Sequence, residues 1–143
     1  HKMIGKAGLF YFKRAGAILD TYTGAGVAYS VCRKLRTAYA GSAIRVKRLN
    51  DNTEQDIGFD GDGNLNQSAL TTFVGANNAQ VVRIYDQTAN AIHLYTGGTA
   101  NRIVVSGTVQ TEGGKPCVVM NSETSFAVFL KSFLRSDPDL VMI

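Results

Sequence analysis

Asp86 and Gln87 stand where an apolar stretch gives way to a polar loop, a position at which side chains often bind ligands. A carboxylate and an amide side by side can hydrogen-bond the hydroxyl groups of a sugar, and the ring of Tyr85 or Tyr95 can offer a stacking face. The candidate ligand-binding residues are Tyr85, Asp86, Gln87, Asn90 and His93. The alternative is that Asp86 accepts hydrogen bonds from backbone N–H groups and shapes the loop, and the sequence leaves both interpretations open.

Acidic residues could also serve catalysis, because glycoside cleavage uses two carboxyl groups about 5 to 9 Å apart, one protonated and one ionised. The residues to consider are Asp56, Asp86, Glu112 and Glu123, and no spacing pairs any two of them. His93 has no Ser or Cys close in sequence that could act as a nucleophile, so we interpret it as a packed, hydrogen-bonded histidine. The sequence assigns no catalytic residue.

Asp60, Asp62 and Asn64 have the spacing that opens a calcium-binding loop. That pattern then needs glycine where Leu65 stands and a bidentate Glu where Thr71 stands. A plain turn is therefore the better interpretation.

The two cysteines, Cys32 and Cys117, are far apart and have no Cys or His partner at ligand spacing. We interpret them as two buried free thiols, although spacing alone leaves a disulfide open. The sequence predicts no metal site and no cofactor.

The clearest local signals lie between residues 43 and 59. Alternating apolar and basic residues predict a strand over Ala43–Leu49, and Asn50-Asp51-Asn52 supplies a turn. A second strand then carries Ile57 and Phe59 on alternate positions. The stretch predicts a β-hairpin from which a sheet can grow.

Two helices are expected. A short one over Gln67–Val74 begins at Asn66, a favourable N-cap, and ends at Gly75. A longer one over Ile18–Leu35 is predicted because apolar residues recur there every four positions. The cations near its end would complement the helix dipole and need no ligand: Arg33, Lys34 and Arg36.

The rest of the chain predicts short strands at near-regular spacing. They are Val81–Tyr85, Ile92–Tyr95, Arg102–Ser106, Thr108–Gln110, Cys117–Met120, Phe126–Phe133 and Leu140–Ile143. Many short strands separated by turns are typical of a β-sandwich or barrel, here with one or two short helices.

The 143 residues, 45% of them hydrophobic, fit one domain with a sizeable core. We divide the chain into a basic, apolar N-terminal arm (1–17) and a β-sandwich domain (18–143), and both apolar ends suggest a fragment of a longer chain. Residues 1–48 contain ten of the 15 Lys and Arg residues and one acidic residue, whereas residues 49–143 contain five basic and ten acidic residues. Such asymmetry lets one part attract another, or a neighbouring copy.

The arm is expected to dock on a partner chain through Phe10, Tyr11, Phe12, Lys13 and Arg14. The apolar C-terminal strand would stay unpaired until another chain or a missing segment completes it. The basic cluster lacks interleaved aromatic residues that stack on bases, which argues against nucleic acid. No apolar run approaches the ~20 residues that a membrane-spanning helix needs.

Four groups of short motifs carry a family resemblance. They are Ala28-Tyr29-Ser30 with Arg33-Lys34-Leu35, Ile44-Arg45-Val46-Lys47-Arg48 with Asp51-Asn52, Ile84-Tyr85-Asp86-Gln87 with Asn90 and His93-Leu94, and Gly114-Lys115-Pro116. In order and spacing they resemble the catalytic domain of α-L-arabinofuranosidase B, over about residues 18–120. The resemblance implies a concanavalin-like or laminin-G-like β-sandwich of jelly-roll type. The family's domain is much longer, so we expect the sandwich in this sequence to be incomplete.

Similar segments occur in large phage virion proteins and in bacterial surface proteins, and residues 56–61 resemble these more closely. In the enzymes the nucleophile and the general acid lie in a later part of the domain, which this sequence is expected not to include. The adjacent cysteine pair of the family's sugar site is missing, and Thr88-Ala89-Asn90-Ala91 replaces a more glycine-rich loop. The resemblance therefore transfers a fold and no catalytic residue.

These observations favour a non-catalytic β-sandwich module of a phage virion (capsid decoration, fibre or tail component) or of a cell-surface protein. Its expected partners are other virion or surface chains, including copies of itself, with a glycan as a further ligand. Its expected location is the virion or the cell exterior. The alternatives are the N-terminal part of an arabinofuranosidase-like glycoside hydrolase, and a lectin-like domain with no assembly role.

Overall fold

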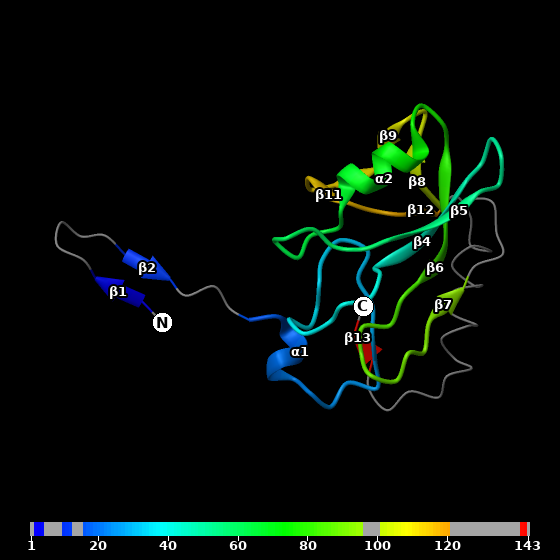
Figure 1. Ribbon diagram of the computed structural model, residues 1–143. Helices are drawn as coiled ribbons and strands as arrows, with labels where there is room; N and C mark the ends of the chain where they lie inside the picture. Colours follow the sequence, from blue (N-terminus) through cyan, green and yellow to red (C-terminus); the bar gives the residue numbers. More distant parts are fainter. Residues whose placement is uncertain (1, 5–9, 13–15, 96–100, 121–140, 143) are drawn as a thin grey trace.

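The computed structural model describes residues 2–4, 10–12, 16–95, 101–120 and 141–142, and its main feature is a seven-stranded antiparallel sheet (Figure 1). The strands of this sheet are β4 (Ile44–Arg48), β5 (Glu54–Ile57), β6 (Ala79–Ile84), β7 (Leu94–Tyr95), β8 (Asn101–Val105), β9 (Thr108–Val109) and β12 (Val119–Met120). Their order is β12-β8-β6-β4-β5, with β7 paired to β6 and β9 paired to β8.

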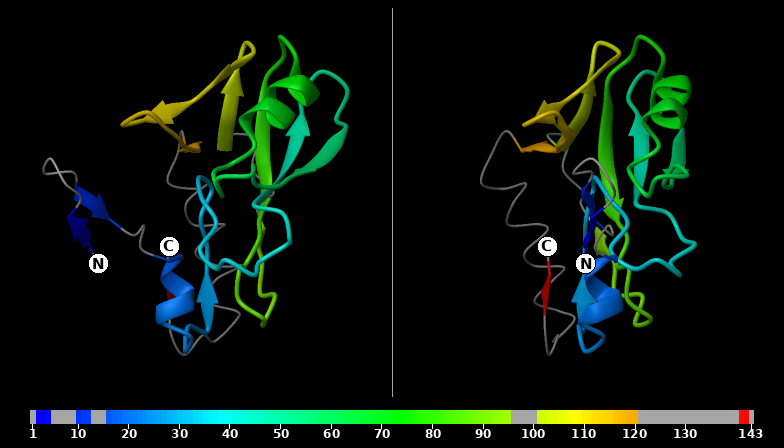
Figure 2. Two further views of the ribbon diagram at one scale, coloured as in Figure 1. Left: turned by 60° about the vertical axis from the view of Figure 1, so that its left-hand side comes forward. Right: turned by 90° about the vertical axis from the view of Figure 1, so that its left-hand side faces the viewer.

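Smaller elements surround this sheet. They are the pairs β1 (Lys2–Ile4) with β2 (Phe10–Phe12), β10 (Thr111–Glu112) with β11 (Lys115–Pro116), and β3 (Val27–Ala28) with β13 (Val141–Met142), and the helices α1 (Ile18–Thr21) and α2 (Gln67–Val74). The main sheet curls around α2 (Figure 2), as the sheets of β-sandwiches do. The mainly β fold with two short helices confirms the class predicted from the sequence.

The β4–β5 hairpin forms where the sequence predicts it. Ile44 pairs with Ile57, and both side chains are fully buried. The turn places Asn52 at φ 61°, a left-handed conformation that Asn tolerates better than most residues. The second strand ends at Ile57, two residues before the predicted Phe59.

The core lies on the sheet face that α2 covers (Figure 2). Leu70 and Val74 of α2 are fully buried there against Val46, Val81 and Ile103 of the sheet. Each such side chain contributes roughly 1.5–3 kcal/mol when it leaves water. This packing fixes α2 over the sheet and leaves the opposite sheet face for polar residues.

The helix predicted over Ile18–Leu35 is wrong. α1 ends at Thr21, and the chain continues through loops and the short strand β3. The backbone N–H of Ala28, which a helix would use internally, instead donates to the side chain of Asp86 at 2.9 Å. The apolar side chains are therefore spaced as in a helix, but the segment does not form a helix.

The prediction of an unpaired C-terminal strand is also wrong, because β13 pairs in parallel with β3 within the chain. The predicted strand Phe126–Phe133 lies outside the described residues. At the other end, β1 and β2 form a hairpin that lies apart from the main sheet (Figure 1). Docking of Phe10, Tyr11 and Phe12 on a partner stays a prediction, and Lys13 and Arg14 lie outside the described residues.

In the described part of the chain, no helix has the length and apolar character needed to cross a membrane.

We expect Asn66→Ala to lower the free energy of unfolding by about 1 kcal/mol. The side-chain oxygen of Asn66 accepts from the backbone N–H of Ala69 at 3.0 Å and so satisfies one of the free donors at the start of α2. Urea unfolding followed by circular dichroism measures the change. The exposed Thr72→Ala in the same helix is the control, with an expected change within about 0.5 kcal/mol. Equal stabilities for the two variants would contradict the capping role.

Candidate functional site

Asp86 lies just beyond the end of β6 and is 1% exposed. Its Oδ1 accepts hydrogen bonds from the backbone N–H groups of Ala28 and Thr88, both at 2.9 Å. Its Oδ2 accepts from the Thr88 hydroxyl at 2.8 Å and from the Ile92 N–H at 3.0 Å. Hydrogen bonds to an ionised acceptor are shorter and stronger than neutral ones. The carboxylate therefore ties β3 to the loop of residues 88–92.

Gln87, the next residue, holds the segment 33–35 in a similar way, and we call Asp86 and Gln87 together the clamp. It is fully buried, its Oε1 accepts from the Leu35 N–H at 2.7 Å, and its Nε2 donates to the Arg33 carbonyl at 3.2 Å. These partners lie 52 and 54 residues away in the sequence. The amide thus fixes the irregular segment 33–35, which has no helix of its own to hold it.

Tyr85 and His93 lie against each other on the outer side of this clamp. Their ring centroids are 4.8 Å apart in an edge-to-face arrangement, and Nδ1 of His93 accepts from the Asp86 N–H at 3.1 Å. The Tyr85 hydroxyl donates to Oδ1 of Asp56 at 2.7 Å. Burial, followed by the bond to Asp56, raises the pKa of Tyr85, so the phenol stays protonated.

The structure brings the five candidate ligand-binding residues together around one loop. The side chains of Asp86 and Gln87 face the interior and hold backbone groups, as the structural interpretation of Asp86 expects. Tyr85 and His93 are half-buried, and Asn90 is exposed with its amide donating to the Gly26 carbonyl at 2.7 Å. Ligand binding by these residues stays a prediction.

Tyr85 also belongs to the polar face of the main sheet, opposite α2. The guanidinium carbon of Arg83 lies 5.5 Å from the Tyr85 ring centroid and 4.6 Å from that of Tyr95, which is 47% exposed. Across the neighbouring strands, Arg45 pairs in register with both Arg83 and Asp56. We call Arg45, Asp56, Arg83, Tyr85 and Tyr95 the sheet-face cluster. It combines an open aromatic ring with planar hydrogen-bonding groups.

The acidic residues of this face are engaged by a shared cation. Arg45 bonds to Glu54 at 2.7 Å through Nε and to Asp56 at 3.1 Å through Nη1. The bond to Glu54 is the main cause of a raised Arg45 pKa. Both carboxylates are therefore engaged in ion pairs with one guanidinium. Of the other acids considered, Asp86 is buried in its clamp, Glu112 lies on β10, and Glu123 is outside the described residues.

The predicted turn at Asp60 forms, and its carboxylate shapes the backbone. Oδ1 of Asp60 accepts from the N–H groups of Asp62 at 3.0 Å and Asn64 at 2.9 Å. Over residues 16–95 and 101–120, whose side chains the structure describes, no three metal-ligating side chains gather. Cys32 and Cys117 are free as predicted, but they are half-buried rather than fully buried.

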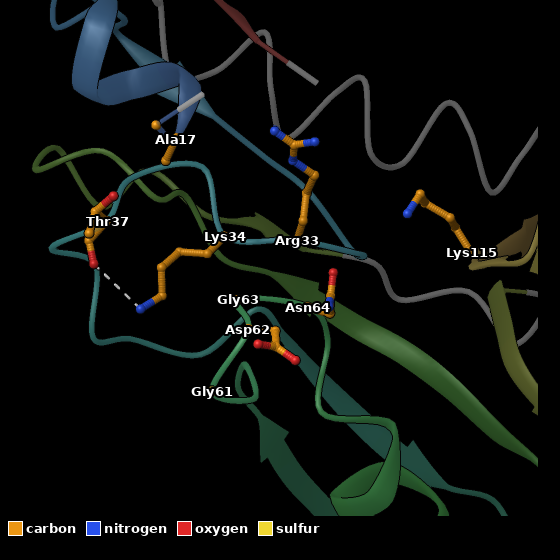
Figure 3. Close-up of a pocket in the computed structure, with 10 residues that line it drawn as sticks. Ala17, Arg33, Lys34, Thr37, Gly61, Asp62, Gly63, Asn64 and Lys115 are labelled. Carbon is orange, nitrogen blue, oxygen red and sulfur yellow. Dashed lines mark hydrogen bonds between the residues drawn. The ribbon is translucent and has the colours of Figure 1, made fainter. Parts of the chain in front are cut away.

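A concavity of about 570 Å³ lies between the start of α1, the segment 33–37, the turn 61–64 and β11 (Figure 3). Arg33, Lys34 and Lys115 bring three cations to its lining, against the single carboxylate of Asp62. We call this hollow the basic concavity. Its two main walls are joined by backbone pairing, because the Lys34 N–H donates to the Gly63 carbonyl at 2.7 Å.

Sequence reasoning missed the basic concavity because it placed Arg33 and Lys34 at the end of a helix that does not form. Two glycines within the predicted 18–35 helix, Gly24 and Gly26, were the signal against that helix. Lys115 carried no signal, since only the fold brings β11 near the turn 61–64.

The fold and these sites can now be set against known proteins. The sequence matches the family described as Alpha-L-arabinofuranosidase B, catalytic, over residues 19–136. The chain belongs to this family, as the resemblance of its short motifs implied. No curated protein sequence matches the chain.

Solved structures agree with the family. A mutant GH54 α-L-arabinofuranosidase soaked with 4-nitrophenyl α-L-arabinofuranoside matches with 26% identity and a TM-score of 0.52. An arabinofuranosidase complexed with arabinofuranosyl-α-1,2-xylobiose matches with the same two values. Each match covers 61% of this chain and 18% of the solved chain. The matched part of the chain thus spans less than a fifth of these enzymes, and the chain is glycoside-hydrolase-like.

We expect His93 to titrate below its ordinary pKa of ~6.5. Burial is the main cause of the lowered pKa and the nearby Arg83 cation adds to it, while Asp86 acts in the opposite direction. The unfolded chain therefore binds the proton more readily than the folded chain. The stability that the neutral ring contributes is fully present above pH ~6.5 and is lost as the pH falls from there through the folded pKa.

An NMR titration of the His93 ring and unfolding midpoints between about pH 5 and 7.5 test this expectation. His93→Gln keeps a hydrogen-bond acceptor for the Asp86 N–H and removes the titration, so the loss of stability toward acid should shrink. A His93 pKa at or above 6.5, or an unchanged acid slope in the variant, would contradict the assignment.

Proposed function

We propose that this chain is a non-catalytic, glycan-binding β-sandwich segment of the arabinofuranosidase type, which holds its sugar on the sheet-face cluster. The single observation that carries the proposal is the arrangement of Arg83 between Tyr85 and the exposed ring of Tyr95. Aromatic rings present a broad apolar face at little entropic cost, and the adjacent guanidinium and carboxylate groups can bond to hydroxyls. The solved relatives carry arabinofuranosides, so an arabinofuranose-bearing glycan is the proposed ligand.

The engagement of the described acids supports a non-catalytic role. Glu54 and Asp56 are held by Arg45, and Asp86 is buried with four hydrogen-bond donors around its carboxylate. Glycoside hydrolysis needs two carboxyl groups that can both reach the scissile bond, whereas these three are already bonded within the chain.

A second candidate function is that of an assembly module in a phage virion or on a cell surface, working through contacts with other chains. The observations that favour it are the β1–β2 hairpin, which lies apart from the main sheet (Figure 1), and the concentration of basic residues in the first third of the chain. Light scattering that finds a stable homo-oligomer would favour this candidate over a free glycan-binding segment.

The glycan proposal is tested by titrating the ¹⁵N-labelled chain with arabinofuranosyl-xylobiose. We expect saturable shifts at the backbone amides of Arg83, Tyr85 and Tyr95, and about fivefold weaker binding for Tyr95→Ala, which loses a stacking face. Tyr22→Ala is the matched control, since Tyr22 is 59% exposed and lies outside the sheet-face cluster.

The same preparation should release no nitrophenol from 4-nitrophenyl α-L-arabinofuranoside above the uncatalysed background. Turnover by the purified chain would contradict the non-catalytic assignment. Equal affinity of the wild type, Tyr95→Ala and Tyr22→Ala would contradict the assignment of the sugar to the sheet-face cluster.

A further inference from the structure

We propose that the basic concavity is a second binding site, which takes the carboxylate of an acidic sugar through Arg33 and Lys115. Both side chains extend into the hollow from separate elements, Arg33 from the segment that follows β3 and Lys115 from β11 (Figure 3). The choice of a sugar as the carrier of the carboxylate rests on the proposed glycan function. The choice of an anion rests on the charges alone.

Within the described part of the chain, the cations of the concavity form no ion pairs. Elsewhere two of the described arginines do form ion pairs: Arg45 is held by Glu54 and Asp56, and Arg48 is bonded to Asp51 at 2.5 Å. Among the residues that the structure describes, neither Arg33 nor Lys115 has an ion-pair or hydrogen-bond partner for its charged group. Lys34 has only a long bond of 3.5 Å to the Thr37 carbonyl. A hollow lined by unpaired charges of one sign concentrates ions of the opposite sign.

Two acids beside the lining, Asp20 and Asp60, already accept hydrogen bonds from the chain. The carboxylate of Asp20 accepts from both the backbone N–H and the hydroxyl of Thr37, and these bonds lower its pKa. Of the described residues that line the hollow, one is a carboxylate, Asp62, and three are cations. The three cations outnumber the carboxylate of Asp62 in the lining, so the charge balance of the hollow favours a ligand carboxylate.

The site is held in place before any ligand arrives. Arg33 bridges in register to Asn64, and its carbonyl accepts from the buried side chain of Gln87 at 3.2 Å. The Lys34 N–H is fixed on the Gly63 carbonyl. Pre-positioned walls reduce the ordering cost of binding. The buried amide of Gln87 thus acts as a positioning group for this concavity.

The size and polarity of the hollow fit a sugar rather than a bare ion. A volume of about 570 Å³ lies within the roughly 300–1,000 Å³ range of small-molecule sites and far exceeds that of one carboxylate. Asn64 and Asp62 line the hollow and supply both donor and acceptor groups for hydroxyls. A uronic acid combines these hydroxyls with the required negative charge.

The test is an NMR titration of the ¹⁵N-labelled chain with a galacturonate disaccharide, its neutral galactose counterpart, and sodium sulfate. We expect saturable shifts at the amides of Gly61 to Asn64 with the galacturonate disaccharide and none with its neutral counterpart. Sulfate should bind with much lower affinity or not at all. Arg33→Gln and Lys115→Gln should each weaken the binding about tenfold, as for the loss of a charged hydrogen bond.

Both residues are exposed, so both variants should fold. Lys47→Gln on β4 removes one cation outside the hollow and should leave the affinity unchanged.

Each contrary outcome overturns the proposal in a defined way. Equal shifts with the neutral disaccharide would show that the site does not recognise the carboxylate. Sulfate binding as tightly as the galacturonate disaccharide would mean an adventitious ion only. Wild-type affinity in both variants would exclude Arg33 and Lys115 as contacts. Tyr95→Ala should bind the galacturonate disaccharide normally, so a failure of the sheet-face proposal is separable from a failure here.

Discussion

The buried carboxylate of Asp86 is the interaction on which the rest of this fold depends. It accepts from Ala28, Thr88 and Ile92, which belong to the N-terminal segment and to the loop after β6. With its neighbour Gln87, it holds a stretch of chain that forms no regular structure of its own against the end of the main sheet. A buried charge is tolerated only when such bonds surround it. The position of the segment 26–35, and of the basic concavity that this segment helps to line, follows from this clamp.

Local signals predicted the parts of the fold that local interactions decide. The β4–β5 hairpin and α2 with its Asn66 cap appear where alternation and capping placed them, because each is stabilised by residues close in sequence. The segment 18–35 could not be predicted in this way. Its backbone groups bond to Asp86 and Gln87, more than fifty residues away, and those bonds override the helical spacing of its apolar side chains. Tertiary context decided against the local pattern.

The candidate sites show the same division. The sequence singled out Asp86 and Gln87, and it left open whether they serve a ligand or the loop. In the structure both side chains are buried, and their hydrogen-bond partners include backbone groups. The sheet-face cluster and the basic concavity needed the strand register and the loop positions, since their members come from elements far apart in the chain. Membership of the arabinofuranosidase B family fixes the fold, while the function proposed here rests on these surfaces.

The most direct test of this account measures what happens to the N-terminal segment when the clamp loses its carboxylate. Hydrogen exchange should show protected amides at Ala28 and Ile92 in the native chain. Asp86→Ala should abolish that protection and lower the free energy of unfolding by about 2–4 kcal/mol, because buried donors lose their acceptor. The exposed Glu112→Ala should change stability by less than about 0.5 kcal/mol. Native-like protection at Ala28 and Ile92 in Asp86→Ala, with stability close to that of the Glu112→Ala control, would contradict the account.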